Sequence, residues 1–274
     1  MLSTNQYCSH SSVDTAGAQR GHMSSEFYQW GVIGVLASAV FIFPVLFFIS
    51  APYGRHSRPG WGPVLPAKVG WILMELPSPI CFLAMFLQGP NSTSAPALIL
   101  AAMFLAHYFY RAFVYPFRMR GSDKTKPLLT VAMAFVFNIF NGSLNGWAIS
   151  ALSPHLNDSW LTDPRFVVGI ALFILGATIN LRSDATLRRL RKPGASGYSI
   201  PNEGLHKHVA SPNYFGEILE WTGFALAAWT LPAATFLIFT IANLAPRARD
   251  HLHWYRQTFD DYPSGRRALI PKIW

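Results

Sequence analysis

Charged residues are scarce in this chain. Asp, Glu, Lys and Arg make up 13% of its 274 residues, and 51% of the residues are hydrophobic. A soluble domain usually carries about 25% charged residues. A chain with so little charge and so many long apolar runs does not fit the soluble class, and the composition predicts an integral membrane protein.

Cysteine and the common nucleotide motifs are also nearly absent. Cys8 and Cys81 are the two cysteines, and Cys81 lies in an apolar run, so we expect no disulfide between them. The H-x-H pairs at 206–208 and 251–253 have no accompanying acid or cysteine cluster, which predicts no metal site. Neither G-x-G-x-x-G nor G-x-x-x-x-G-K-[ST] occurs, so a nucleotide would not be held by a Rossmann unit or a P-loop.

Long apolar runs fill most of the chain. Residues 1–26 are polar and lack periodicity, which predicts a mobile extension before a single domain at 27–274. A helix of about 20 apolar residues can cross a bilayer. Such runs are expected at 30–50, 69–87, 97–117, 128–152, 166–180, 213–230 and 233–244. The sequence therefore predicts an all-α integral membrane protein with seven transmembrane helices.

The basic residues give this topology an orientation. Of 22 Lys and Arg residues, 19 follow the first, third, fifth and seventh predicted spans, and two, Arg20 and Arg165, fall on the other side. Lys and Arg concentrate in cytoplasmic loops, which predicts an outside N-terminus and a cytoplasmic C-terminus. The net charge of +9 is thus explained by topology. Because its basic residues are divided among separate segments, we expect no nucleic-acid binding.

Glu75 is an acid inside an apolar span, just before Pro77 and Pro79. The prolines predict a kink or break in the helix past Glu75. An ionisable group within a span marks a functional site by default. A protonated Glu75 could donate a hydrogen bond to a substrate carbonyl, although a Glu that bonds a neighbouring helix would have the same sequence pattern.

Two further helix faces carry polar groups. Tyr108, Arg111 and Tyr115 share a face near the end of the third span, either as an anion-binding group or as an interfacial belt. Asn180 and Asp184, with an arginine at position 191, share a face of the fifth. They could hold ribose hydroxyls and phosphates, or could form ordinary i,i+4 ion pairs.

The C-terminal quarter combines acids in an apolar helix with a basic, aromatic tail. Asn213, Glu217 and Glu220 lie at i, i+4 and i+7, and therefore on one helix face. The tail at 247–267 carries arginines, histidines and tyrosines, and its composition favours anion binding beside that acidic face. In the fourth span, asparagines at 138, 141 and 145 are expected to form hydrogen bonds between helices.

Together these motifs resemble the steroid 5α-reductase family. The resemblance extends over residues 53–274, and a bacterial member is expected. The runs that carry it are WILMELPS from Trp71, HYFYRAFVY from His107, FILGATINLRSD from Phe173, LRRLRKPG from Leu187, NYFGEILEW from Asn213 and FDDYPSGRRALIP from Phe259.

The resemblance implies NADPH-dependent reduction of the 4,5 double bond of 3-oxo-Δ4 steroids in a seven-helix membrane fold. Glu75 and Tyr108 would hold the 3-keto oxygen, with Met74 beside the steroid. We expect a monomer in the bacterial inner membrane, or in the endoplasmic reticulum of a eukaryote, with the steroid entering from lipid. The residues implied around NADPH are Tyr53, Arg111, Tyr115, Asn180, Asp184, Arg191, Tyr198, Asn213, Glu217, Arg247, His251, Tyr255 and Arg266.

The chain departs from the family pattern at four positions. Met74 stands in place of a Gln, Met119 in place of an Asn, and Ser122 and Ser199 in place of arginines. These differences bear on steroid preference and on how the 2′-phosphate is held. Two other functions are weighed against the reductase: a membrane methyltransferase resembling the isoprenylcysteine type, and a non-catalytic seven-helix receptor or transporter.

Overall fold

The computed structural model describes residues 23–50, 60–119, 125–191 and 197–274. Of the extension predicted at 1–26, residues 1–22 lie outside the described residues, as do Tyr53 and Ser122, and α1 already begins at Ser25. The helices are α1 (Ser25–Phe48), α2 (Ala67–Glu75), α3 (Pro77–Phe86), α4 (Ala95–Phe109), α5 (Tyr115–Arg118), α6 (Leu128–Ala151), α7 (Pro164–Leu190), α8 (Pro212–Ala228) and α9 (Leu231–Thr258).

Shorter elements connect or flank these helices. A π-helical segment, η2 (Tyr110–Val114), joins α4 to α5, and the 3-10 helices η3 (Asp158–Thr162) and η4 (Gly204–Lys207) lie in loops. Strands β1 (Val64–Pro66) and β2 (Thr125–Pro127) form a small antiparallel pair, which the all-α prediction did not include. The π-helical segment carries Arg111, and such segments are frequent at functional sites.

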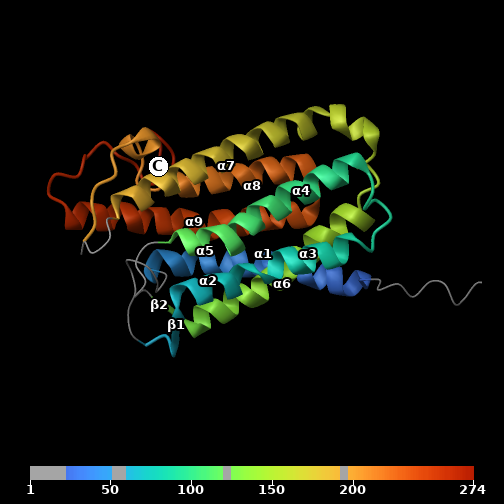
Figure 1. The fold of residues 1–274 in the computed structure, drawn as a ribbon, viewed down its shortest axis with the longest axis horizontal. Coiled ribbons are helices and arrows are strands. Elements are labelled where there is room, and N and C mark those ends of the chain that lie inside the picture. The colour runs from blue at the N-terminus through green and yellow to red at the C-terminus, as the bar shows by residue number, and fades with distance from the viewer. Residues whose placement is uncertain (1–22, 51–59, 120–124, 192–196) are drawn as a thin grey trace, which may run out of the picture.

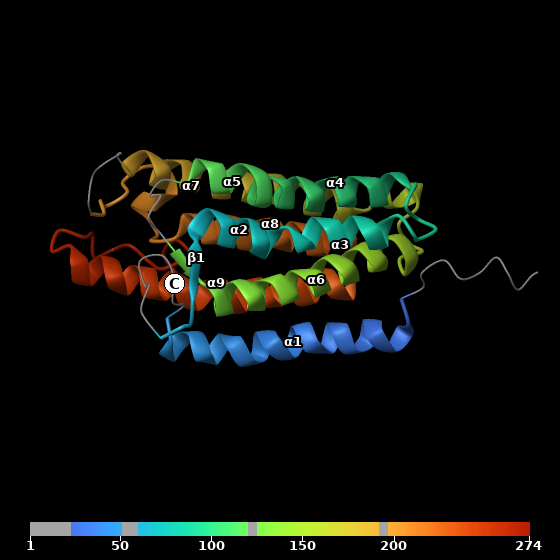
Figure 2. The same cartoon turned by 60° about the horizontal axis from the view of Figure 1, so that its bottom comes forward.

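The helices run side by side as an elongated bundle (Figures 1 and 2). In the described residues, six helical stretches are long and apolar enough to cross a membrane, and they indicate an integral multi-pass membrane protein. They are Ser25–Phe48, Ala67–Phe86, Ala95–Arg118, Leu128–Ala151, Pro164–Leu190 and Leu231–Thr258. The remaining predicted span corresponds to α8, whose 17 residues give a length of about 26 Å. The seven-span topology therefore stays a prediction.

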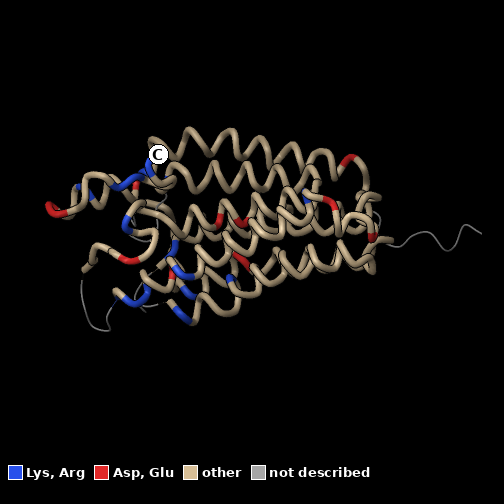
Figure 3. Tube along the Cα trace, turned by 90° about the horizontal axis from the view of Figure 1, so that it is seen from above, with Lys and Arg blue, Asp and Glu red and all other residues tan. Residues whose placement is uncertain are grey.

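Basic side chains gather at one end of the bundle. Figure 3 shows most of the described Lys and Arg residues at the end where the C-terminus lies, whereas the opposite end carries few of them. The C-terminal ends of α1, α5 and α7 lie at this same end, and α9 extends into it (Figure 1). This arrangement fits the cytoplasmic C-terminus expected from the sequence, although the orientation in a membrane remains a prediction.

The second membrane stretch is divided at Leu76. α2 ends at Glu75 and α3 begins at Pro77, so the predicted interruption just past Glu75 is confirmed. Leu76 itself stays in the right-handed helical region, and its N–H still donates to the carbonyl of Ile72. Proline is tolerated at the first position of a helix because its missing N–H needs no partner there. The chain thus continues in nearly the same direction past Glu75.

Glycines allow α7 and α8 to approach closely. A Cβ on Gly169 would lie 2.6 Å from the backbone nitrogen of Ala227, and one on Gly216 would lie 2.5 Å from that of Asn180. Gly176 and Gly223 face the partner backbone equally closely. Small residues drive such helix pairs in membranes because they let the backbones touch. The close contact brings the polar faces of α7 and α8 against each other.

The bundle is apolar outside and polar in part of its interior. Exposed large apolar side chains such as Trp30, Phe41 and Ile174 cover its outer faces. The buried polar residues within the helical stretches include Glu75, Ser78, Asn138, Asn141, Asn145, Asn180, Ser183, Asp184 and Glu220. Ionisable groups at such positions are costly and tend to mark functional sites.

Candidate active site

Glu75 and Arg111 form an ion pair inside the bundle. Glu75 is the last residue of α2 and is 7% exposed. Arg111 lies on η2, and its Nη2 donates to Glu75 Oε1 at 2.9 Å. Breaking one partner of a buried ion pair is costly because the other charge is left uncompensated. Glu75 therefore accepts a hydrogen bond in this structure, and it would need a proton before it could donate one to a substrate.

Trp71 positions the Arg111 side of this pair. The indole Nε1 donates to the Arg111 carbonyl at 2.9 Å, and the Arg111 guanidinium lies 4.5 Å from the centre of the Trp71 ring. Tyr115 packs on Trp71 at 4.8 Å, and its own ring centre is 5.5 Å from the guanidinium. Arg111 is thus held by a carboxylate, a backbone bond and two aromatic faces. Its buried Nε has no hydrogen-bond partner among the described residues.

Lys126, which sequence reasoning did not select, joins the same group. It belongs to β2 and is 5% exposed, and its Nζ lies 4.2 Å from the centre of the Trp71 ring. Burial, reinforced by the positive charge of Arg247, lowers the pKa of Lys126 to about 7. A lysine in a loop gives no sequence signal of burial, because that burial comes from the pairing of β1 with β2.

The asparagines of α6 hold Tyr108 in place. Asn141 Nδ2 donates to the Tyr108 hydroxyl at 2.7 Å, and that hydroxyl donates to Asn138 Oδ1 at 3.3 Å. Asn138 Nδ2 in turn donates to the carbonyl of Met74 at 2.6 Å. Asn145 bonds Asn141 and completes the row. The predicted interhelical bonding is confirmed for Asn138 and Asn141, and Tyr108 is one of their partners, whereas Asn145 bonds Asn141 within α6.

A second buried pair involves His107, the residue before Tyr108 on α4. His107 Nδ1 is 2.8 Å from Glu220 Oε1, and the His107 ring packs on Trp221 at 4.6 Å. Trp221 also lies near Tyr108, with ring centres 6.0 Å apart. Glu220 was noted as part of the polar face of its helix, but His107 was not selected. The only sequence signal for this pair is a histidine next to Tyr108 in an apolar span.

The predicted polar faces of α7 and α8 meet. Asn180 Nδ2 donates to the Asn213 carbonyl at 3.0 Å and to Glu217 Oε2 at 3.4 Å. Asn213 Nδ2 donates to Asp184 Oδ1 at 3.1 Å. The glycine contacts described above bring these four side chains together. The structure therefore assembles Asn180, Asp184, Asn213 and Glu217, which the sequence had placed on two separate helices.

The first half of the predicted tail is a continuation of α9. Arg247, His251 and Tyr255 lie at i, i+4 and i+8 and therefore share a helix face. Arg247 Nη2 donates to the Tyr214 hydroxyl at 2.9 Å, and His251 Nδ1 is 3.0 Å from the Ser211 hydroxyl. Both partners lie at or next to the start of α8, so this face of α9 packs against the helix that carries Asn213 and Glu217.

Arg266 and Tyr198 lie farther out, at the basic end. Arg266 is 3% exposed, and its Nη1 donates to the Pro201 carbonyl at 2.8 Å while its Nη2 donates to Asn202 Oδ1 at 3.1 Å. Tyr198 packs against Trp254 at 4.8 Å. Arg266 thus fixes the loop that leads from Tyr198 toward η4.

Arg191, Tyr198 and Tyr255 line a small hollow of about 20 Å³ at the end of α7. Most of the predicted cofactor residues thus lie around the meeting point of α7, α8 and α9, whereas Arg111 and Tyr115 lie on η2 and α5 beside Glu75 and Trp71. Tyr53 lies outside the described residues. Their side chains suit a dinucleotide, because amides and carboxylates can bond ribose hydroxyls while arginines can bond phosphates. The unpartnered Nε of buried Arg111 adds a donor that has no protein acceptor among the described residues.

Comparison with known proteins gives one consistent result. The family described as 3-oxo-5-alpha-steroid 4-dehydrogenase matches residues 124–274. The chain is 46% identical over 226 residues to 3-oxo-5-alpha-steroid 4-dehydrogenase 1 of Macaca fascicularis, with 80% of this chain and 83% of that protein covered. It is 45% identical over 221 residues to the Homo sapiens protein of the same name, with 80% and 85% covered.

A plant protein is nearly as similar. The chain is 41% identical over 233 residues to steroid 5-alpha-reductase DET2 of Gossypium hirsutum, with 84% of this chain and 90% of that protein covered. The similarity to the animal and plant proteins therefore extends well beyond the matched C-terminal region and includes most of the helical bundle.

Proposed function

Because the chain belongs to the 3-oxo-5-alpha-steroid 4-dehydrogenase family, we propose that it reduces the 4,5 double bond of 3-oxo-Δ4 steroids with NADPH. The hydrogen bonds of Asn138 support placing the reaction beside Tyr108 and Glu75. Asn138 bonds both the Tyr108 hydroxyl and the carbonyl of Met74, the residue before Glu75. Asn138, a neutral side chain on α6, thereby holds both Tyr108 on α4 and the backbone next to Glu75 on α2. Tyr108 and Glu75 are the two residues able to bond one ketone oxygen.

Tyr108 and Glu75 bind the 3-keto oxygen in this proposal. When the double bond is reduced, negative charge moves onto that oxygen as an enolate. Donors fixed in advance in a site with little water stabilise such charge most effectively. The asparagines of α6 keep the Tyr108 hydroxyl oriented. Because Glu75 is ion-paired with Arg111, its action as a donor requires that a proton be taken up when the ketone binds.

The residues around α7 and α8 hold the cofactor. The amides of Asn180 and Asn213 and the carboxylate of Asp184 supply bonds for hydroxyl and carboxamide groups, and Arg247 and Arg191 supply cations for phosphates. When bound, the nicotinamide supplies the hydride that C5 receives, and protonation of the enolate at C4 completes the reduction. Arg111 lies between the two groups of residues, since it bonds Glu75 and its charge interacts with those of Asp184 and Glu217.

The steroid reaches the site from lipid. The outer faces of the bundle are apolar, and an apolar substrate partitions into the bilayer. The interior around Tyr108 offers aromatic packing from Phe104 and Trp221. Apolar surface of this kind suits the hydrocarbon rings, whereas the polar contacts remain concentrated at the ketone.

Reduction of a steroid panel tests the proposal. Purified protein in detergent is incubated with NADPH and several 3-oxo-Δ4 steroids, and the products are identified. We expect loss of NADPH absorbance together with a 5α-reduced ketone. Matched incubations contain a saturated 3-keto steroid, which lacks the reacting bond and should give no turnover. Methyl transfer from S-adenosylmethionine to an isoprenylcysteine substrate, with no reduction of any enone, would contradict the proposal.

A further inference from the structure

The His107–Glu220 pair is a buried polar contact to which the proposed reaction gives no role. Its atoms Nδ1 and Oε1 lie 2.8 Å apart, and the two side chains are 8% and 4% exposed. Aromatic rings surround the pair, since Trp221 packs on the His107 ring and Phe104 packs on Trp221. Apolar side chains of similar volume usually stabilise a protein as well as a buried ion pair does. A histidine and a carboxylate in this apolar core therefore point to chemistry rather than to stability.

Glu220 fixes the orientation of the imidazole. Nδ1 of His107 faces the carboxylate, so the N–H at this nitrogen donates to Glu220 and Nε2 lies on the far side of the ring. Among the described residues, Nε2 has no hydrogen-bond partner. A carboxylate that bonds one ring nitrogen orients the other nitrogen for proton transfer. The free Nε2 is thus the atom through which His107 can exchange a proton with a ligand.

His107 lies beside the proposed ketone site. It directly precedes Tyr108 on α4, and the two ring centres are 5.2 Å apart. Both rings also pack near Trp221, at 4.6 Å for His107 and 6.0 Å for Tyr108. In the proposed function the Tyr108 hydroxyl bonds the 3-keto oxygen, and C4 is the carbon next to that carbonyl. An imidazole that shares the surroundings of Tyr108 is therefore well placed to reach C4.

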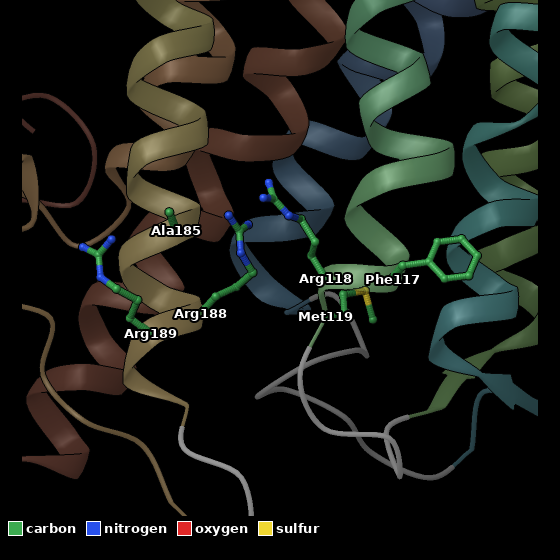
Figure 4. A pocket seen from close by; sticks show the side chains of 6 residues that line it. All are labelled: Phe117, Arg118, Met119, Ala185, Arg188 and Arg189. Carbon is green, nitrogen blue, oxygen red and sulfur yellow. The ribbon is translucent and has the colours of Figure 1, made fainter.

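The basic end of the bundle gives water access to the interior. An open hollow of about 420 Å³ lies there between α5 and α7 (Figure 4). The side chains of Arg118 and Arg188 extend into the space between these helices (Figure 4). Arg188 lies one helical turn beyond Asp184 on α7. The hollow therefore opens close to the polar residues that α7 shares with α8.

Polar residues continue along α8 from this end to the His107–Glu220 pair. Asn213, at the start of α8, bonds Asp184. Glu217 follows about one turn later, and Glu220 lies about one turn beyond Glu217. The charge of Glu217 interacts with that of His107. From Asn213 to Glu220 the helix rises about 10 Å, so this polar face supplies a short route for protons from water.

We propose that His107 is the catalytic residue that donates the proton to C4, and that Glu220 is the positioning residue that orients its ring. The inference rests on the proposed function, because C4 needs a proton only after C5 has received a hydride. The electron pair of the enolate takes the proton from Nε2 and forms the new C4–H bond, and the 3-keto carbonyl is restored. His107 is left neutral with Nδ1–H still bonded to Glu220, and a proton from water recharges it before the next turnover.

A donor fixed on one helix delivers its proton to one face of C4. An enolate that escapes into water before protonation can instead be protonated on either face. The stereochemistry at C4 therefore distinguishes a proton from His107 from a proton from bulk water. Neutral His107 can also run the step backwards and remove the same C4 proton from a saturated 3-keto steroid, which requires no NADPH.

The first experiment follows deuterium at C4. The detergent-purified full chain reduces a 3-oxo-Δ4 steroid with NADPH in deuterium oxide, and NMR of the product after one turnover gives the face that carries deuterium. We expect one face for the wild type and both faces for H107Q, while single-turnover NADPH oxidation shows that H107Q still transfers hydride. H155Q is the matched control and should resemble the wild type. The His155 ring packs on Trp160 at 4.6 Å and bonds the Ala228 carbonyl at the other end of α8.

The second experiment measures exchange without NADPH. A saturated 5α-3-keto steroid is incubated with each variant in deuterium oxide, and the rate of deuterium uptake at C4 is followed. Loss of a general acid or base typically costs 10²–10⁴ in rate. We therefore expect H107Q to slow the enzyme-dependent exchange about 10²-fold or more. E220Q keeps a hydrogen-bonding side chain without its charge and should slow the exchange less, whereas H155Q should not slow it.

The outcomes separate the inference from the function on which it rests. Deuterium on both faces of C4 in the wild-type product would overturn the inference, as would one-sided deuterium and a wild-type exchange rate in H107Q, even if enones are reduced. Equal losses of hydride transfer and exchange in H107Q would make His107 a packing residue and overturn its role as donor. If H107Q does not fold, wild-type stereochemistry and exchange in E220Q would overturn the pair. Absence of enone reduction by the wild type would refute the proposed function, whereas the exchange rates would still test His107 by themselves.

Discussion

The site consists of two regions with opposite chemistry. Around Tyr108, buried neutral amides of α6 fix one hydroxyl, and the nearest charges, Glu75 and Arg111, neutralise each other. At the basic end, arginines bond aromatic hydroxyls and backbone carbonyls, as Arg247 does with Tyr214. Neutral donors stabilise a charge that develops only during a reaction, whereas fixed cations bind a charge that a ligand already carries. The difference separates the proposed chemistry from the proposed cofactor binding.

The largest expected effect concerns Glu75. We expect Glu75→Ala to lower kcat by about 10²–10³, the usual cost of losing one oxyanion donor. Glu75→Gln keeps a neutral donor and should retain more activity than Glu75→Ala. Steady-state assays with a saturating 3-oxo-Δ4 steroid provide the measurement. Equal activity in the two variants would show that hydrogen-bond donation by residue 75 has no part in turnover.

A smaller loss is expected for Asn138→Ala. This change removes the bonds to the Tyr108 hydroxyl and to the Met74 carbonyl together. Because Asn138 acts through other residues, we expect kcat to fall about tenfold to a hundredfold while KM for NADPH stays near the wild-type value. Asn145→Ala is the matched control, since the Asn145 side chain donates to Asn141, whereas Asn138 bonds Tyr108 and Met74. A rise in the KM for NADPH with no change in kcat would instead assign Asn138 to the cofactor-binding region at the basic end.

Arg266→Ala should affect the basic end alone. Arg266 holds the loop at 201–202 through its two terminal nitrogens. Its loss is expected to raise the NADPH dissociation constant about tenfold, because charge-assisted bonds contribute on the order of 1.5–3 kcal/mol. Calorimetry measures the constant, and Arg267→Ala, which changes a neighbouring exposed arginine, serves as control. Unchanged NADPH binding would remove Arg266 from the cofactor region.

The smallest effect is a change in how stability depends on pH. Lys126 has a pKa of about 7 in the folded protein because burial and Arg247 disfavour its charge, whereas an unfolded lysine titrates near 10.4. The unfolded state binds more protons between these values, so stability should rise as pH increases from about 7 to about 10. We expect Lys126→Met to flatten this part of the melting-temperature profile. An equally steep profile in the variant would show that Lys126 is not buried as a neutral group.

The two regions also differed in how far the sequence predicted them. Glu75, Tyr108 and Arg111 were recognisable because ionisable and hydroxyl groups are rare in apolar spans, and the proline after Leu76 correctly marked the helix boundary. The pairing of His107 with Glu220 could not be predicted, because it depends on which helices are neighbours. Periodicity gives the face of one helix but not its partner.

The basic end was harder to interpret from the sequence. Its arginines were correctly assigned to one end of the bundle (Figure 3), but the role of each depends on local contacts. Arg266 uses its terminal nitrogens on a loop, and Arg189 is paired with Glu203. Lys126 was not selected because a three-residue strand buries it. The number of Lys and Arg residues in each loop predicts the end of the bundle at which the cations gather. Which of these cations can contact a ligand depends on the local contacts of the folded protein.

We propose that Tyr108 and Glu75 act on the same ketone oxygen. A double-mutant cycle with Tyr108→Phe and Glu75→Gln tests it most directly, using single-turnover NADPH oxidation with a saturating 3-oxo-Δ4 steroid. We predict that Tyr108→Phe alone slows this step by about 10²–10³, and that the double variant loses less than the product of the single effects because the donors share one acceptor. A wild-type rate in Tyr108→Phe, or strictly multiplicative losses in the double variant, would contradict the shared ketone site.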